Sequence, residues 1–156
     1  MKHGGELPGI VRAHLARVLN EESGLAEGEL TARDPALAAA GASFVTLKKS
    51  GELRGCIGSL KAHRSLARDL LDNSVSAATR DRRFSPVTAA ELADLEVEVS
   101  ILTPPVPLAY DGLEDLKTKL RPGVHGVILS HGGRRGTFLP QVWESLPMVD
   151  LFLSQL

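Results

Sequence analysis

The sequence predicts a protein that mixes α-helices with β-strands joined by short turns. Two stretches carry apolar residues at helical spacing, one at residues 10–20 and one at residues 65–79. Two others alternate between apolar and polar residues as half-buried strands do, at residues 42–48 and 96–102. Short clusters that contain glycine separate several of the strands, as hairpins require. Helices and strands are therefore both expected in the folded chain.

The first part of the chain is predicted to run from a helix into a hairpin. The helix covers residues 10–20. Residues 21–35 are polar and rich in glycine and glutamate, which predicts a loop or short connector. The strand at 42–48 leads through Ser50-Gly51, a plausible two-residue turn, into a second strand at 52–60.

The middle of the chain is predicted to hold a helix, a short capped helix and the clearest strand. An apolar stripe marks the helix at 65–79, and the arginines that follow it lie where cations favour a helix C-terminus. Thr88 and Glu91 have the spacing of a capping box, so a short helix is expected to start there. The strand at 96–102 follows.

Prolines at 104, 105 and 107 must interrupt regular structure after that strand. The only tryptophan, Trp143, is expected to anchor a core through its large apolar ring. The last third is predicted to contain a helix at 113–120, strands at 127–130 and 136–139 around a turn at 131–134, and helices at 140–146 and 148–156.

Length and composition favour one domain of a cytoplasmic protein. The chain has 156 residues, of which 43% are hydrophobic and 24% charged. A formal net charge of -1 argues against chain-wide attraction to nucleic acid or to an anionic membrane, although it leaves room for a local basic patch. One cysteine cannot form an internal disulfide. No apolar run has the length of a membrane span, and the N-terminus lacks a signal-peptide core.

The segment Leu53-Arg54-Gly55-Cys56-Ile57-Gly58 concentrates the unusual residues of the chain. It holds the only cysteine, between two glycines and directly after an arginine. Glycines in a strand suit a bulge or a close approach of another group to the backbone. Gly55 and Gly58 are therefore candidate ligand-binding positions.

Cys56 is the candidate nucleophile. A thiolate is a good nucleophile, and Arg54, two residues earlier on an extended strand, is expected on the same face, where its charge would lower the pKa of the thiol. His63, His125 and His131 are available as bases. The alternative is that Cys56 is a small buried apolar residue with no chemical role.

Glu96 and Glu98 are expected to project from one face of their strand. Paired carboxylates can act as acid and base or hold a cation, and the alternative is an ordinary solvated strand face. No Cys-x-x-Cys pair and no His-x-x-x-His pair is present, so no metal site is predicted.

The arginines form a candidate surface for recognising an anion. Guanidinium groups bind carboxylate or phosphate in a bidentate manner, which makes Arg54, Arg80 and Arg83 candidate ligand-binding residues. The alternative is that they are surface arginines paired with acidic residues. The sequence Gly132-Gly133-Arg134-Arg135-Gly136 lacks the spacing and the Lys-Ser/Thr of a phosphate-binding loop.

Four segments carry a family resemblance: residues 53–58, 80–86, 95–100 and 132–143. Together they resemble the AMMECR domain family, whose prokaryotic members are labelled AmmeMemoRadiSam system protein A. The resemblance implies an α+β fold with an antiparallel sheet flanked by helices, a smaller second lobe and a cleft near Cys56. It implies no established activity, and it suggests Memo-like and radical S-adenosylmethionine proteins as partners. No cofactor is predicted.

The same resemblance implies one AMMECR-like domain over residues 1–156. Family members usually continue beyond this point into a further C-terminal piece, so the chain is either a short variant or truncated.

Three functions are compatible with these patterns. The preferred one is a small-molecule or anion-binding domain that works with the two partner proteins. The second is an enzyme that uses Cys56 as nucleophile. The third is a protein-interaction or nucleic-acid-associated module without catalysis.

Overall fold

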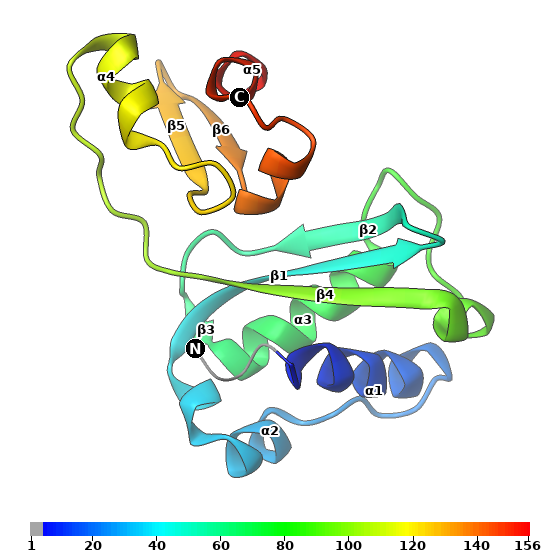
Figure 1. The fold of residues 1–156 in the computed structure, drawn as a ribbon. Coiled ribbons are helices and arrows are strands. Elements are labelled where there is room, and N and C mark those ends of the chain that lie inside the picture. The colour runs from blue at the N-terminus through cyan, green and yellow to red at the C-terminus, as the bar shows by residue number, and fades with distance from the viewer. Residues whose placement is uncertain (1–4) are drawn as a thin grey trace. The chain divides into compact units, whose positions relative to one another are not determined.

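The computed structural model describes residues 5–156 of the chain. It divides into two compact units, Met1–Pro104 and Pro105–Leu156. Each unit combines helices with antiparallel strands, which confirms the α+β class and the smaller second lobe (Figure 1). The segment before residue 5, which includes most of the N-terminus examined for a signal peptide, lies outside the described residues.

The larger unit is built on an antiparallel sheet with β1 (Ala40–Lys49) at its centre. β2 (Glu52–Gly58) pairs with one edge of β1, and β4 (Leu95–Leu102) pairs with the other edge along eight residue positions. The two-residue β3 (Arg64–Ser65) pairs with the start of β1. The hairpin from β1 to β2 and the strand β4 are thus confirmed.

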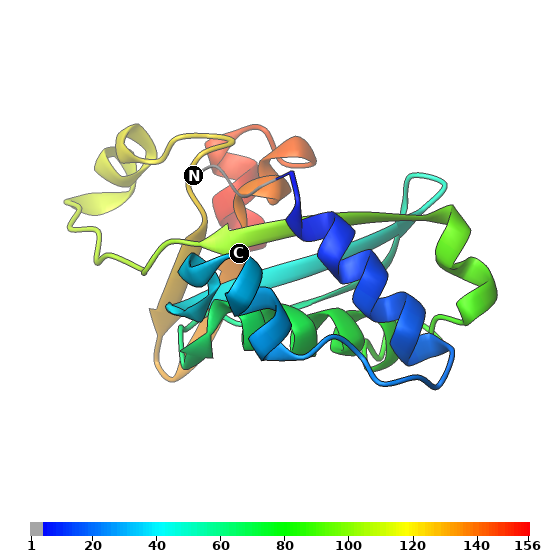
Figure 2. The same cartoon turned by 90° about the horizontal axis from the view of Figure 1, so that it is seen from below.

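Helices α1 (Leu7–Leu19) and α3 (Leu66–Thr79) lie along one face of this sheet (Figure 2). Their apolar stripes bury that face, as the helical spacing predicts. Pro8 in the first turn of α1 lacks an N–H that would have no partner there, which suits the helix start at Leu7. Fully buried members of the resulting core include Val11, Leu15, Val45, Leu47 and Leu70.

The predicted loop at 21–35 is wrong in part, because it contains the helix α2 (Glu27–Arg33) and the 3₁₀ turn η1 (Pro35–Ala38). α2 has seven residues and buries Leu30 in the core. A helix this short gains most of its stability from tertiary packing, so its periodic signal is weak. Its acidic first turn and basic last turn suit the helix dipole.

The turn between β1 and β2 fits the prediction. Ser50 and Gly51 have φ angles of 53° and 78°, and positive φ at both central residues is the type I′ geometry that matches the twist of hairpin strands. The pairing register shifts between Leu47 and Lys48, whose partners are Gly55 and Leu53. Arg54 is therefore the extra residue of a β-bulge.

The capped ends of the middle segment follow the sequence signals. Ser65 is the N-cap of α3, and its hydroxyl accepts a hydrogen bond from the Arg68 N–H. The Glu91 carboxylate accepts the N–H of Thr88, as a capping box requires. The element that follows, η2 (Ala89–Asp94), is a 3₁₀ helix.

The smaller unit consists of α4 (Gly112–Lys119), the hairpin of β5 (Val127–His131) and β6 (Arg134–Phe138), the 3₁₀ helix η3 (Pro140–Glu144) and α5 (Val149–Gln155). The turn is shorter than the predicted 131–134, since Gly132 and Gly133 alone connect the strands, with φ angles of 54° and 79°. The predicted helix at 140–146 is a shorter 3₁₀ helix.

Trp143 anchors the core of the smaller unit, as expected. Its ring stacks on Phe152 with 3.7 Å between centroids, and its indole Nε1–H donates to the carbonyl of His125 at 2.7 Å. Leu120 completes the fully buried set. None of the helices in the described part of the chain combines the length and the apolarity needed to cross a bilayer.

Candidate functional site

The sheet of the larger unit brings five polar side chains onto the face opposite to α1 and α3. Thr46 lies between Cys56 of β2 and Glu98 of β4 as the cross-strand partner of both. Lys48 is likewise the partner of Glu96. Successive side chains of a strand point to opposite faces, so these residues share one face while Val45 and Leu47 face the core. We call Thr46, Lys48, Cys56, Glu96 and Glu98 the polar face.

Cys56 is half-buried and its thiol is free. Its Sγ lies 3.2 Å from the Oγ1 of Thr46, a hydrogen bond in which either group can donate. Among residues 5–156, no histidine or carboxylate is hydrogen-bonded to this sulfur. The thiol therefore has a hydroxyl neighbour, and no described residue is hydrogen-bonded to it as the general base that activates a cysteine nucleophile.

Asp81 connects the turn after α3 to β2 through a hydrogen bond at Cys56. Its Oδ2 accepts the backbone N–H of Cys56 at 2.9 Å. The same carboxylate accepts two side-chain hydrogen bonds from Arg83, at 3.0 Å from Nε and 2.7 Å from Nη2. The Arg83 hydrogen bonds, with those of the backbone N–H groups, hold the pKa of this carboxyl far below its usual range despite the burial of Asp81. Asp81 is thus an ionised carboxylate that holds both the Cys56 backbone and the Arg83 guanidinium.

Arg83 presents its guanidinium beside Cys56. Its Nη2 donates to the Cys56 carbonyl oxygen at 3.4 Å, and the hydrogen bonds that Arg83 donates to the Asp81 carboxylate raise the pKa of Arg83. The side chain is 57% exposed, and its Nη1 makes no hydrogen bond to the described residues. The Asp81 pair therefore orients the guanidinium while leaving N–H donors for another acceptor.

Arg54 does not join this group. Its guanidinium binds both carboxylate oxygens of Glu91 at 3.1 Å, and it also donates to the carbonyls of Ser85 and Pro86. Lys49 reaches the same carboxylate at 3.2 Å. These cations, Arg54 first, lower the pKa of Glu91 to about 2. The expected placement of Arg54 on the face of Cys56 is wrong because the bulge interrupts the alternation of β2.

The two glycines around Cys56 each have a packing reason. A Cβ on Gly55 would lie 2.1 Å from the carbonyl oxygen of Ala77 in α3, so β2 and α3 could not approach as closely with any other residue. A Cβ on Gly58 would lie 2.2 Å from the ring of Phe44. A ligand-binding role for Gly55 and Gly58 stays a prediction.

Of the remaining predicted residues, Glu96 and Glu98 belong to the polar face and Arg80 does not. Glu98 forms an ion pair with Lys48 at 2.6 Å, while Glu96 is exposed at the neighbouring position of β4. Arg80 is exposed and forms the C-cap of α3. In the part of the chain that the structure describes, no three His, Cys, Asp or Glu residues gather into a metal-binding group.

The three candidate base histidines lie apart from one another in the chain. His63 is exposed between β2 and β3. In the smaller unit, His125 accepts the N–H of Arg121 through its Nδ1, and His131 ends β5.

Comparison with known proteins places the chain in a family. A model of the AMMECR1 family matches residues 9–156. The chain belongs to the AMMECR1 family. This confirms the resemblance found from the residues 53–58 and the three later segments.

Relatives of this AMMECR1-family chain occur in archaea and bacteria. A protein of Methanothermobacter thermautotrophicus is 50% identical over 99 residues, which cover 64% of this chain and 52% of that protein. A protein of Thermotoga maritima is 48% identical over 102 residues, which cover 64% of this chain and 55% of that protein. The chain thus spans about half the length of the curated relatives it matches.

A solved structure shares the fold. The crystal structure of the uncharacterized protein PH0010 from Pyrococcus horikoshii superimposes with a TM-score of 0.82 and 31% sequence identity, over 93% of this chain and 72% of that chain. This agreement covers nearly all the elements of the AMMECR1 domain described above.

Sequence reasoning missed two acidic residues that organise this AMMECR1 domain. Asp81 went unnoticed among the arginines around it, although one acid among three arginines directly after a helix was a usable signal. Asp69 is 1% exposed on the apolar side of α3. Its carboxylate accepts hydrogen bonds from Ser43, Ser59, Arg64 and Asn73.

The Asp69 cluster ties α3 to β1 and to the segment that leads to β3. Asn73, one turn along α3, also donates to the carbonyl of Ser43 at 3.0 Å. A buried carboxylate with this many donors is satisfied, so the cluster fixes the fold rather than offering a free group. The signal in the sequence was a polar pair at i and i+4 inside an apolar helical stripe.

Proposed function

We propose that this AMMECR1-family protein is a binding domain for a small ligand that carries an anionic group, held beside Cys56. The observation that carries the proposal is the geometry of Arg83. Asp81 fixes its Nε and Nη2, while its Nη1 makes no bond to the described residues and the side chain is 57% exposed. A guanidinium that is already oriented loses less conformational entropy when it binds carboxylate or phosphate.

The polar face supports the rest of the ligand site. The Cys56 thiol and the Thr46 hydroxyl stand next to each other, and Glu98 follows in the same row across the sheet. Hydroxyl and thiol groups at this spacing suit a polar ligand whose anionic end meets Arg83. Glu96, the exposed member of the polar face, and the exposed Arg80 are further candidates for contact with such a ligand.

Binding is favoured over covalent catalysis because no base among residues 5–156 is hydrogen-bonded to the sulfur. Its hydrogen-bond partner is Thr46, and Asp81 bonds the backbone N–H of Cys56 rather than its thiol. An enzyme that used Cys56 as nucleophile would need a base supplied by the ligand or by a partner.

Partners and location are part of the proposal. The family resemblance suggests that the domain works with Memo-like and radical S-adenosylmethionine proteins, in which case it would supply or hold a ligand for them. The single cysteine fits work in the reducing cytoplasm.

The test is a titration of the ¹⁵N-labelled protein with inorganic phosphate and, separately, with citrate. We expect the Cys56 N–H and Arg83 Nε–H signals to shift together, because Asp81 links the two groups. Arg83→Gln should weaken binding about tenfold or more, as expected for loss of a charge-assisted hydrogen bond. Arg82→Gln, an exposed neighbour with the same charge change, is the matched control.

Substitution of Cys56 separates the binding domain from the thiol enzyme. A binding domain should retain anion affinity in both Cys56→Ser and Cys56→Ala, whereas a covalent enzyme would lose turnover in both. The proposal fails if neither anion shifts the Cys56 and Arg83 signals, or if Arg82→Gln is as harmful as Arg83→Gln.

A further inference from the structure

The hairpin of the smaller unit, residues 127–138, carries a concentration of positive charge. No aspartate or glutamate occurs between Asp115 and Glu144. The same stretch contains Lys117, Lys119, Arg121, Arg134 and Arg135, together with His125 and His131. Lys117 and Lys119 are neutralised by acids of the unit, at Asp150 and Asp115, but the arginines of the hairpin form no ion pair within the described residues. We call residues 127–138 the cationic hairpin.

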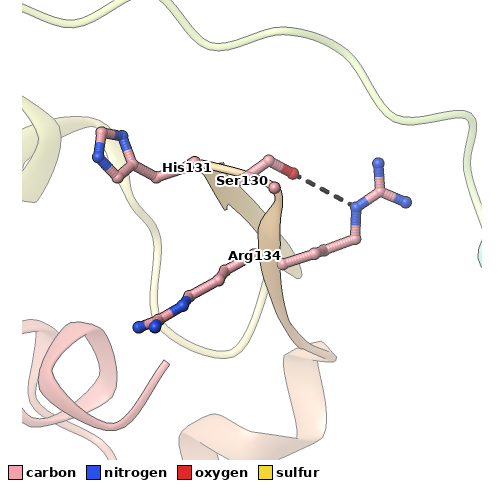
Figure 3. Close-up of a pocket in the computed structure, with 6 residues that line it drawn as sticks. Ser130, His131 and Arg134 are labelled. Carbon is pink, nitrogen blue, oxygen red and sulfur yellow. Dashed lines mark hydrogen bonds between the residues drawn. The ribbon is translucent and has the colours of Figure 1, made fainter.

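The cationic side chains lie on both faces of this two-stranded ribbon. Arg134 is the cross-strand partner of His131, and Arg135 is the partner of Ser130, one position further along. Cross-strand partners share a face and adjacent positions alternate, so Arg134 and Arg135 point to opposite faces. Figure 3 shows Ser130 directed to one side of the ribbon and His131 and Arg134 directed to the other. The Nε–H of Arg135 donates to the Ser130 hydroxyl at 3.3 Å, which places it on the side of Ser130.

The turn at the end of the ribbon has no side chains and is exposed. Gly132 and Gly133 form the turn, and a Cβ at either position would meet nothing within 4 Å. The residues 130–135 surround an open hollow of about 340 Å³, and Arg134, Arg135 and His131 are all exposed. Another molecule could therefore approach the backbone of the turn closely, between the two arginines.

We propose that the cationic hairpin binds the phosphate backbone of duplex nucleic acid. Two guanidinium groups on opposite faces of a ribbon cannot converge on one small anion, but they can reach two phosphate rows that flank a groove. The major groove of B-DNA is about 12 Å wide and admits a two-stranded β-ribbon. The site is distinct from the anion site proposed beside Cys56, since it uses other residues in the other unit.

This local charge is compatible with a chain that is nearly neutral. Phosphate contacts by a few arginines supply sequence-independent affinity that falls with added salt. For two phosphate contacts, the affinity should fall about twelvefold between 50 mM and 200 mM salt, because each contact contributes a slope of about -0.9 in log K against log salt.

The test is a titration of the full ¹⁵N-labelled chain with a short DNA duplex of mixed sequence, at several salt concentrations. We expect the amide signals of Gly132 and Gly133 to shift while that of Cys56 stays in place. Arg134→Gln/Arg135→Gln should abolish most of the salt dependence, lowering its slope by about 2. Arg33→Gln/Arg82→Gln is the control, because it removes two exposed charges from the larger unit.

The outcomes are decisive either way. Loss of binding in the hairpin variant with retention in the control would support the proposal. No shift of Gly132 and Gly133 at 50 mM salt, or equal weakening by both double variants, would overturn it. Equal affinity for inorganic polyphosphate, lost with the same hairpin variant, would also overturn it, since the site would then recognise anions without needing a groove. None of these results depends on whether phosphate binds beside Cys56.

Discussion

The carboxylate of Asp81 accepts the backbone N–H of Cys56, with 2.9 Å between the nitrogen and Oδ2. This bond connects the turn after α3 to the strand that carries the only thiol of the chain. Because Arg83 is held by the same carboxylate, one buried acid positions both groups of the proposed anion site.

Asp81→Asn should lower the free energy of unfolding by about 1–2 kcal/mol at neutral pH, since it removes charge-assisted hydrogen bonds from an exposed arginine and from the backbone N–H of the half-buried Cys56. The pKa of Asp81 is depressed in the folded state, so its contribution is present above the unfolded pKa and is lost as pH falls below about 4. Urea unfolding at pH 7 and pH 3 should show the difference between the two proteins shrinking. If the difference in unfolding free energy were the same at both pH values, the ionised Asp81 carboxylate would not be the source of the stabilisation.

Glu91→Gln tests the pair that holds Arg54 away from Cys56. We expect a loss of about 1–2 kcal/mol at pH 7, where Arg54 and Lys49 both bind the carboxylate. The folded pKa of Glu91 is lowered to about 2, so the difference from the parent protein should fade as pH drops from about 4.5 to 2. Glu52→Gln, an exposed acid in β2, should show little change in urea unfolding at either pH.

Gly55→Ala should destabilise the protein by about 1–3 kcal/mol, because the new Cβ would collide with the Ala77 carbonyl and force β2 and α3 apart. Gly28→Ala is the matched control, since that position in α2 has nothing within 4 Å of a new Cβ. It should leave stability unchanged or slightly raised. Thermal unfolding of both variants distinguishes a packing role for Gly55 from a role only in ligand binding, which would leave stability unchanged.

His14 should give the protein a pH dependence near neutrality. It is buried, its Nδ1 accepts the N–H of Leu25 at 2.9 Å, and burial lowers its pKa. A lowered pKa in the folded state means that stability is fully present above about pH 6.5 and declines as the pH falls toward the folded pKa.

Substitution of His14 by asparagine tests this dependence. Asn can still accept the Leu25 N–H but cannot titrate, so His14→Asn should flatten the unfolding free energy between about pH 5 and pH 7. His63→Asn, at an exposed histidine, should keep the slope of the parent protein. If His63→Asn flattened this slope and His14→Asn did not, the pH dependence of stability would come from His63 and the prediction would be wrong.

The secondary structure was largely predictable, and the exceptions have local causes. The strand 96–102 and the helix 65–79 were visible because their periodicity extends over many residues. The Ser50-Gly51 turn was visible because few residues adopt its positive φ angles. The helix α2 was not visible, since seven residues with one buried leucine give almost no periodic signal.

Only part of the candidate site was predictable, namely the strand around Cys56 and the shared face of Glu96 and Glu98. The segment around Cys56 identified the strand, and alternation placed Glu96 and Glu98 on a common face. The position of Arg54 was not predictable in this way, because one bulge residue reverses the faces of a strand. Asp81 was missed because its bond to the backbone N–H of a distant strand cannot be read from the sequence, which showed only an acid among three arginines.

The amino-acid order alone settled the family, the kinds of element and the turn that joins the first two strands, because motif identity, side-chain periodicity and backbone sterics are local properties. Tertiary structure decided which charges meet: Arg54 with Glu91, Arg83 with Asp81, and two hairpin arginines on opposite faces. Such pairings depend on strand register and on contacts between segments that are distant in the sequence. Both are stabilised only when the whole core packs.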